Sequence, residues 1–296
     1  MKKEPSLHLS NSIKRLRISA NKLVNSRIVG GYRSVFRGRG MEFSGYRHYS
    51  PDDDASIIDW KASVRSKDIL VKEFIEERNL NVFFLVDVCS SMVYSSIDKL
   101  KMEYAAELVS TLSYTILQSG DSVGFAFFND KIIKHEFPMS GMKQYHKIVR
   151  SLADPSYYGG NYDLGEALKF SMALLKEFSL VIIISDFIGL KEDWKHHLKL
   201  VGKKFDLIGI MILDPVDEFL PSYNGQIVVG DPFSDRQLIV NVDSISPYYS
   251  KYMQLREEEI RSAFIDANGD FIKLTTNNPF LKPIVDFFIR RAKKIR

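Results

Sequence analysis

The stretch "NVFFLVDVCSSM" (81–92) places five consecutive apolar residues directly before an acid, Asp87, and a run of small side chains. A short, unbroken apolar run of this kind is typical of a strand that is buried on both faces of a parallel sheet. Such a strand presents the acid that ends it at the edge of the sheet. We therefore interpret 81–87 as the first strand of an α/β domain and Asp87 as part of a candidate site.

Strand-like and helix-like segments alternate along the rest of this region. Helical periodicity and stop signals predict helices over residues 96–120, 142–152, 163–178, 191–204 and 247–267, and from about 279. Apolar runs and turn residues predict strands over 122–130, 131–137, 180–186, 205–214 and 271–275, and a polar hairpin over 226–230 and 237–242. This alternation predicts a doubly wound, mostly parallel central sheet with helices on both faces.

Three of the predicted buried strands end in an acid, namely Asp87, Asp186 and Asp214. We expect the first strand to lie between those at 122–130 and 180–186, so that Asp87 and Asp186 are neighbours where the strand order reverses. Ligands bind at this point in doubly wound sheets. Two adjacent carboxylates repel each other unless a proton or a cation lies between them, and Mg²⁺ is a cation that suits oxygen ligands.

Bulk composition indicates a protein of a reducing compartment. The single cysteine excludes an internal disulfide, and the longest apolar runs, "LVIII" and "VFFLV", are too short to span a membrane. The N-terminus lacks the apolar core of a signal peptide. We therefore expect a cytoplasmic protein with no membrane span.

The first 40 residues carry ten Lys or Arg and one acid, a net charge of +9, whereas the whole 296-residue chain carries +4. A helix is predicted over 11–28, and an irregular segment follows from Gly30 to about Asn79. A basic arm suits a negatively charged partner, such as nucleic acid, an anionic membrane or an acidic protein face. Packing of the helix on the body of the protein is the simpler interpretation, because basic helical faces are common.

The end of the first strand resembles the metal-ion-dependent adhesion site of von Willebrand factor type A domains. That site uses an Asp-x-Ser-x-Ser loop after the first strand, a Thr from a later loop and an Asp after the fourth strand. In this chain Asp87, Cys89, Ser91 and Asp186 stand in the matching places. The resemblance implies a type A-like fold and a metal site at the carboxyl ends of the strands.

The candidate site departs from that pattern in two places. A thiol at Cys89 is a poor ligand for Mg²⁺, and the segment "GGNYDLGEAL" (159–168) offers Asn161 or Tyr162 where the Thr is usual. We therefore expect Mg²⁺ or Mn²⁺ to bind weakly or not at all, and Cys89→Ser alone to strengthen binding if the other ligands are well placed. The degenerate ligand set is Asp87, Ser91, Asp186 and Asn161.

A second resemblance lies upstream, in "RGRGMEFSGYRHYSPDDDASIIDWKASVRSKDILVKEFIEE" (37–77). This segment closely resembles the block that defines a prokaryotic family known as domain of unknown function 58. Asp52 stands where that family usually has Gly, and Ser56 where it usually has Arg. The matching residues are Gly38, Gly40, Glu42, Phe43, Arg47, Tyr49, Pro51, Asp53, Asp54, Ile58, Asp59, Trp60, Arg65, Val71, Lys72 and Phe74.

The block divides the chain into three parts. We predict a basic arm at 1–36, a family-specific segment at 37–80 that packs on the main domain, and the type A-like domain at 81–296. Charged residues around an aromatic ring favour an internal ion network that fixes the segment against the sheet, with partner contact as the alternative. The residues of this network are Arg47, Asp53, Asp54, Asp59, Trp60 and Arg65.

The family resemblance implies a type A-like domain without known catalytic activity. Genes of this family commonly stand beside one for a MoxR-type AAA+ ATPase, and the pair is thought to act in the assembly, maturation or insertion of other complexes. We therefore expect a non-enzymatic protein-interaction module that binds such an ATPase or its client. The alternative is a Mg²⁺-dependent phosphodiesterase or nuclease that uses Asp87, Asp186 and Asp214 and binds nucleic acid through the basic arm. The 37–77 block and the absence of a third acid in the first loop favour the module, so we do not expect nucleic acid as a partner.

Three tyrosines crowd the loop "SYYGGNYD" (156–163), which we expect at the carboxyl edge of the sheet. Exposed tyrosines give a large contact area with little loss of entropy, so this loop favours recognition of a protein partner. Packing of the rings on the neighbouring helix is the alternative. The residues concerned are Tyr157, Tyr158 and Tyr162.

Overall fold

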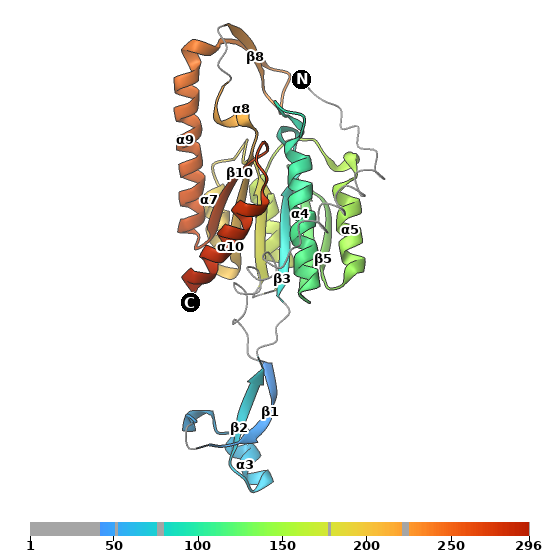
Figure 1. Ribbon diagram of the computed structural model, residues 1–296, viewed down its shortest axis with the longest axis vertical. Coiled ribbons are helices and arrows are strands. Elements are labelled where there is room, and N and C mark those ends of the chain that lie inside the picture. The colour runs from blue at the N-terminus through green and yellow to red at the C-terminus, as the bar shows by residue number, and fades with distance from the viewer. Residues whose placement is uncertain (1–41, 51–52, 76–79, 177–178, 221–224, 296) are drawn as a thin grey trace.

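A computed structural model describes residues 42–50, 53–75, 80–176, 179–220 and 225–295 (Figure 1). The predicted helix at 11–28 lies outside these residues. The strands are β1 (Glu42–His48), β2 (Leu70–Ile75), β3 (Asn81–Asp87), β4 (Ser122–Phe128), β5 (Ile132–Met139), β6 (Ser179–Ser185), β7 (Asp206–Leu213), β8 (Gln226–Gly230), β9 (Gln237–Asn241) and β10 (Asp270–Thr275). The α-helices are α3 (Trp60–Ser66), α4 (Lys101–Gln118), α5 (Met142–Leu152), α6 (Leu164–Leu174), α7 (Trp194–Lys204), α8 (Pro215–Glu218), α9 (Val242–Asp266) and α10 (Leu281–Ile295).

The central sheet has six strands in the order β10-β7-β6-β3-β4-β5, and β5 alone runs antiparallel to its neighbour. Helices α4, α5 and α10 lie on one face, and α6, α7 and α9 lie on the other (Figure 1). The prediction of a doubly wound, mostly parallel sheet is confirmed. The prediction that the first strand lies between β4 and β6 is also confirmed, so the strand order reverses beside β3.

The apolar runs that mark the strands form the core. Residues 82–86 of β3 are each at most 1% exposed, and the cross-strand neighbours on β4 and β6 are buried with them. Burying a Val, Leu or Phe side chain stabilises a fold by roughly 1.5–3 kcal/mol. This burial on both faces also fixes the register that brings the ends of β3 and β6 together.

The prediction of an irregular segment from Gly30 to about Asn79 is wrong for its described part. Strands β1 and β2 pair antiparallel, and α3 lies between them in the chain. The Asp59 carboxylate accepts hydrogen bonds from the amides of Lys61 and Ala62 and so caps α3. These local hydrogen bonds give the segment regular structure, while its packing on the main domain stays a prediction.

Two helices begin at residues other than those predicted. Helix α4 begins at Lys101 rather than at 96, because Ser95 and Ser96 bind Asp214 instead of continuing the helix. Helix α9 begins at Val242, where the Asn241 side chain caps it. In the described part of the chain, no helix combines the length and the apolar composition that crossing a membrane requires.

Candidate functional site

The carboxyl ends of β3, β6 and β7, with the loops that follow them, form what we call the carboxyl edge. Asp87 ends β3 and is 1% exposed. Its Oδ1 accepts a 2.8 Å hydrogen bond from the Cys89 amide, and its Oδ2 accepts a 2.6 Å bond from Ser185 Oγ. Burial raises the pKa of Asp87 to about 7, and the charge of Asp186 adds to this rise. Asp87 therefore holds a proton far more readily than an exposed carboxyl group.

Asp186 directly follows β6 and is fully buried. Its Oδ1 accepts a 2.9 Å hydrogen bond from the Ile188 amide. Its Oδ2 lies 2.7 Å from Nζ of Lys101, the first residue of α4. The prediction that Asp87 and Asp186 lie at one edge of the sheet is therefore correct. The positive charge beside Asp186, however, is the ammonium group of Lys101.

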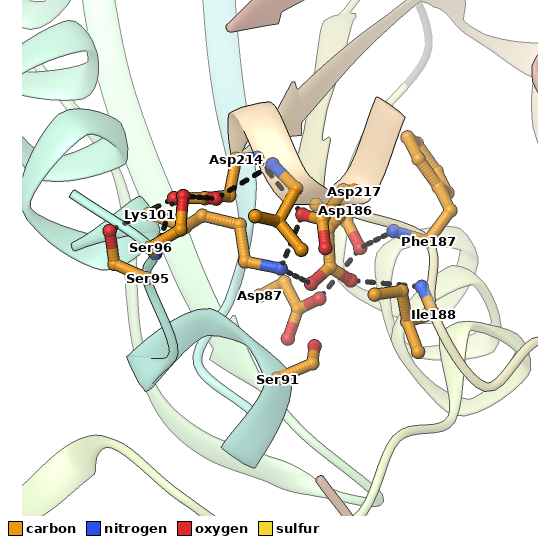
Figure 2. Close-up of polar contacts among 12 residues, drawn as sticks. Asp87, Ser91, Ser95, Ser96, Lys101, Asp186, Phe187, Ile188, Asp214 and Asp217 are labelled. Atoms are coloured by element: carbon orange, nitrogen blue, oxygen red, sulfur yellow. Dashed lines mark hydrogen bonds and ion pairs between the residues drawn. The ribbon is translucent and has the colours of Figure 1, made fainter. Parts of the chain in front are cut away.

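The Lys101 ammonium joins the charged groups of the carboxyl edge, and the sequence analysis did not predict it. Its side chain is 2% exposed, and Nζ also lies 2.9 Å from Asp217 Oδ2 on α8. Figure 2 shows this ammonium reaching to the Asp186 and Asp217 carboxylates. Burial alone would lower the pKa of Lys101, but the charges of Asp186 and Asp217 raise it above its usual range. Lys101 is therefore a permanent buried cation.

Asp214 takes a structural role in the same region. Its carboxylate accepts hydrogen bonds from Ser95 Oγ and the Ser96 amide, each at 2.9 Å, from the Ser96 hydroxyl, and from the Val216 amide at 3.0 Å. Burial would raise the pKa of Asp214, but the hydrogen bonds from Ser96 and Val216 outweigh it and lower the pKa. Asp214 thus caps α8 and anchors the segment before α4 (Figure 2).

Cys89 and Ser91 face each other within the loop after β3. Cys89 Sγ lies 3.1 Å from Ser91 Oγ, and both side chains are buried. Burial and the neighbouring Asp87 raise the pKa of the Cys89 thiol above its usual range. The thiol therefore stays protonated, which removes the thiolate that nucleophilic attack and metal ligation require.

The loop at 156–163 places its residues differently from the prediction. Asn161 is exposed, whereas Tyr162 is 4% exposed and its hydroxyl lies 3.2 Å from Ser185 Oγ. The prediction of Tyr162 in an exposed contact surface is therefore wrong, because its ring is buried and packs on Phe128. Tyr157 packs half-buried on Phe127.

Tyr158 is also half-buried, and its hydroxyl donates a 2.8 Å hydrogen bond to the Leu152 carbonyl. Burial raises the pKa of Tyr158 above its usual range. A direct role of Tyr157 and Tyr158 in binding a partner stays a prediction, and part of each ring already packs on the domain.

The Lys101 ammonium beside Asp186 does not fit a divalent cation bound to the same carboxylate. Both oxygens of Asp186 are engaged, one by the Ile188 amide and one by Lys101, and both oxygens of Asp87 accept hydrogen bonds. Across the described ranges, no group of three or more His, Cys, Asp or Glu residues is placed to hold a metal ion. We derive no chemistry through a metal at this edge.

The six residues of the predicted ion network are only partly brought together. Arg47 binds Asp53 through two nitrogens at 2.5 and 2.6 Å, and this hydrogen-bonded pair lowers the pKa of Asp53 to about 2. Asp54 caps the 3-10 turn at Ala55–Ile57, as Asp59 caps α3. Two members of the set point to solvent instead, since Trp60 is 64% exposed and Arg65 is exposed.

An exposed apolar surface lies beyond the carboxyl edge, where the sequence predicted a polar hairpin. Strands β8 and β9 pair with Val228 opposite Ile239 and Val229 opposite Leu238, and these side chains are 43–70% exposed. Along α9, three exposed apolar residues follow at helical spacing and so share one face of the helix. We use the name ribbon surface for the exposed apolar residues on both faces of the β8–β9 ribbon and along α9: Val228, Val229, Leu238, Ile239, Tyr248, Tyr252 and Leu255.

The ribbon surface is joined to the carboxyl edge by several contacts. The Phe233 ring in the β8–β9 turn packs so closely on Gly189 that an added Cβ there would lie 3.0 Å from it. Arg256 of α9 donates a 2.9 Å hydrogen bond to the Asp186 carbonyl. Figure 1 shows β8 and α8 beyond the same end of the sheet. The sequence did contain a sign of this exposed apolar surface. Consecutive residues of each strand are apolar, although only every second residue of a strand can face one side.

The profile of the family described as "Protein of unknown function DUF58" matches residues 45–259. This chain belongs to the DUF58 family. The DUF58 chain is similar to the uncharacterised protein Rv1480 of Mycobacterium tuberculosis, with 22% identity over 96% of this chain and 90% of that protein. It also resembles the uncharacterised protein YeaD of Bacillus subtilis, with 27% identity over 42% of this chain and 29% of that protein.

Solved structures similar to this DUF58 protein share little of its sequence. The conserved hypothetical protein BatB from Bacteroides thetaiotaomicron is 15% identical, with 72% of this chain and 99% of that chain covered and a TM-score of 0.47. A von Willebrand factor type A protein from Catenulispora acidiphila is 10% identical, with 75% of this chain and 45% of that chain covered and a TM-score of 0.45.

Proposed function

We propose that this DUF58 protein is a non-enzymatic interaction module whose partner is a MoxR-type AAA+ ATPase. The observation that carries the proposal is the ribbon surface beside the carboxyl edge. Large exposed apolar patches on soluble domains mark sites of association, because leaving them in water is unfavourable. The choice of partner rests on the family resemblance, which associates these proteins with ATPases of this type.

The form of the ribbon surface suits a protein partner. In the described part of the chain, the β8–β9 sheet has two strands, so each strand has one edge whose backbone groups pair with no neighbouring strand. An extended segment of a partner can add to such an edge through backbone hydrogen bonds while its side chains contact Leu238 or Ile239. The exposed Tyr248 and Tyr252 rings add the amphipathic contact area that interfaces favour.

The chemistry of the carboxyl edge favours binding over catalysis. The Cys89 thiol is held protonated, Asp186 is paired with Lys101, and the Asp214 oxygens bind Ser95, Ser96 and Val216. A hydrolase that uses metal-bound water needs carboxylates free to hold the metal. We therefore infer that the edge acts as a rigid base for recognition. The family resemblance, and not the edge, is the basis for the further proposal that the ATPase and this protein act together on a third protein.

The test measures binding of the purified protein to a purified MoxR-type ATPase from the same organism. We expect Ile239→Asp with Tyr252→Asp to weaken binding by about tenfold or more, since losing a buried apolar contact residue costs on the order of 1–2 kcal/mol. The matched control is Phe137→Asp, because Phe137 is 57% exposed on β5 at the opposite side of the sheet. No binding by the unmodified protein, or equal binding by the double variant, would refute the proposal.

A further inference from the structure

We propose that Lys101 supplies, as part of the chain, the positive charge that a divalent cation supplies in the adhesion sites that this edge resembles. The carboxyl edge is then assembled without a metal ion. The consequence for recognition, that the partner is bound without a bridging metal ion, rests on the proposed function. The assignment of Lys101 stands on the geometry alone.

The first argument is the mutual need of two buried charges. Asp186 is fully buried and Lys101 is 2% exposed, with 2.7 Å between Oδ2 and Nζ. A carboxylate removed from water is strongly destabilising unless a cation compensates it, and the same is true of an ammonium group. Lys101 and Asp186 therefore compensate each other's burial, and Lys101 also shares its charge with the less buried Asp217.

The second argument is that the ligand positions are taken. The Lys101 ammonium contacts Asp186 and Asp217 at once, as a bridging cation would. The remaining oxygen of Asp186 accepts from the Ile188 amide, and the Asp87 oxygens accept from Cys89 and Ser185. A divalent ion at Asp186 would have to displace the ammonium, because two cations cannot share that oxygen without strong repulsion.

The third argument is that the fold holds Lys101 in this position before any partner arrives. Lys101 is the first residue of α4, and the Leu100 amide before it donates a 3.0 Å hydrogen bond to Glu103. Upstream, Asp214 holds Ser95 and Ser96. The start of α4 is therefore fixed on both sides of the ammonium, so the charge does not have to be recruited from solution.

The role assigned to Lys101 changes the expected effect of replacing Cys89 on metal binding. A serine at position 89 would restore one oxygen ligand, but the Lys101 ammonium would still occupy the oxygen of Asp186. We therefore expect Cys89→Ser alone to gain no metal binding, in contrast to the expectation from the sequence. Removal of Lys101 is the step that opens the site, because Mg²⁺ is held by one or two carboxylates with several waters.

The experiment compares the unmodified protein with Cys89→Ser, Lys101→Ala, the double variant and the control Lys99→Ala. Lys99 is a part-exposed lysine two residues away that pairs with Glu107 at 2.5 Å. Each is titrated with Mg²⁺ and with Mn²⁺ by calorimetry, and each is melted with the metal and with EDTA at equal ionic strength. We expect the unmodified, Cys89→Ser and Lys99→Ala proteins to show no heat of binding and no shift in Tm.

We expect Lys101→Ala to have a lower Tm that millimolar Mg²⁺ or Mn²⁺ raises, and the double variant to bind more tightly. If Lys101→Ala does not fold without added cation, refolding is repeated in MgCl₂, where recovery supports the proposal and failure overturns it. Metal binding by the unmodified protein, or a folded Lys101→Ala protein that metal does not stabilise, also overturns it. These readouts need no partner, so a failure of the proposed function leaves them intact.

Discussion

Ser185 Oγ donates a 2.6 Å hydrogen bond to the Asp87 carboxyl group, and this bond joins the last residues of two adjacent parallel strands. It lies inside the protein, where Asp87 is 1% exposed and Ser185 fully buried. The same burial that protects the bond raises the pKa of Asp87 from 3.8 to about 7. The edge therefore contains an acid that titrates close to neutrality.

The first prediction concerns the dependence of stability on pH. The folded protein holds the Asp87 proton more tightly than the unfolded chain does, so the protonated Asp87 stabilises the fold. Its contribution to the free energy of unfolding is fully present below pH 3.8 and is lost as the pH rises to about 7. Within that window Asp87 should make the free energy of unfolding fall by about 1.4 kcal/mol per pH unit. We expect Asp87→Asn to remove this part of the slope in urea unfolding measured at a series of pH values.

The control for the pH series is Asp130→Asn, because Asp130 is exposed in the turn between β4 and β5. Its profile should follow that of the unmodified protein. Identical slopes for Asp87→Asn and the unmodified protein would show that Asp87 does not carry this titration.

The second prediction concerns Asp214 as an anchor. Asp214→Ala leaves the donors of Ser95, Ser96 and Val216 without their acceptor and should lower the free energy of unfolding by roughly 1–3 kcal/mol. Ser96→Ala keeps the hydrogen bond from the backbone amide and loses only that from the hydroxyl, so it should lower the free energy of unfolding by less. Denaturant titration measures both, and a larger loss for Ser96→Ala than for Asp214→Ala would contradict the anchoring role.

The third prediction uses the two tryptophans to test the packing of segment 37–80. Trp60 is 64% exposed, whereas Trp194 is 5% exposed. In a Trp194→Phe variant the remaining fluorescence should be readily quenched by acrylamide, and in a Trp60→Phe variant it should be largely protected. Protection of Trp60 equal to that of Trp194 would instead support the sequence-based expectation that this segment packs on the main domain.

The sequence predicted the sheet well because its strands are buried on both faces. The unbroken apolar runs at β3, β6 and β7 have one stable solution, a parallel sheet covered by helices, and the acid at the end of each run marks the carboxyl edge. Asp87 and Asp186 were therefore found from sequence alone.

Lys101 was not found because its role depends on where α4 begins. The segment "SIDKLKMEYAAEL" offers both Lys99 and Lys101 at helical positions, and only tertiary contacts decide which one faces the sheet. The hydrogen bonds from Ser95 and Ser96 to Asp214, over a hundred residues away in sequence, set that start. The same limit applies to Asp217, whose place on a four-residue helix follows from the capping of α8 by Asp214.

The last prediction concerns the reactivity of Cys89, the single cysteine of the chain. Its side chain is fully buried, and burial together with Asp87 raises the pKa of the thiol, so both access and the thiolate needed for attack are lacking. We expect Ellman's reagent to react with the folded protein at least about 100-fold more slowly than with the chain in guanidinium chloride, because reaction must wait for local opening. The control is Cys89→Ser with Ser156→Cys, which moves the thiol to an exposed position in the loop after α5 and should react fast when folded. Lys101→Ala should speed the reaction of Cys89, since an uncompensated Asp186 loosens the packing beneath the loop after β3. Fast labelling of the folded, unmodified protein would mean that this loop opens readily, and the carboxyl edge would then be a mobile surface instead of a fixed one.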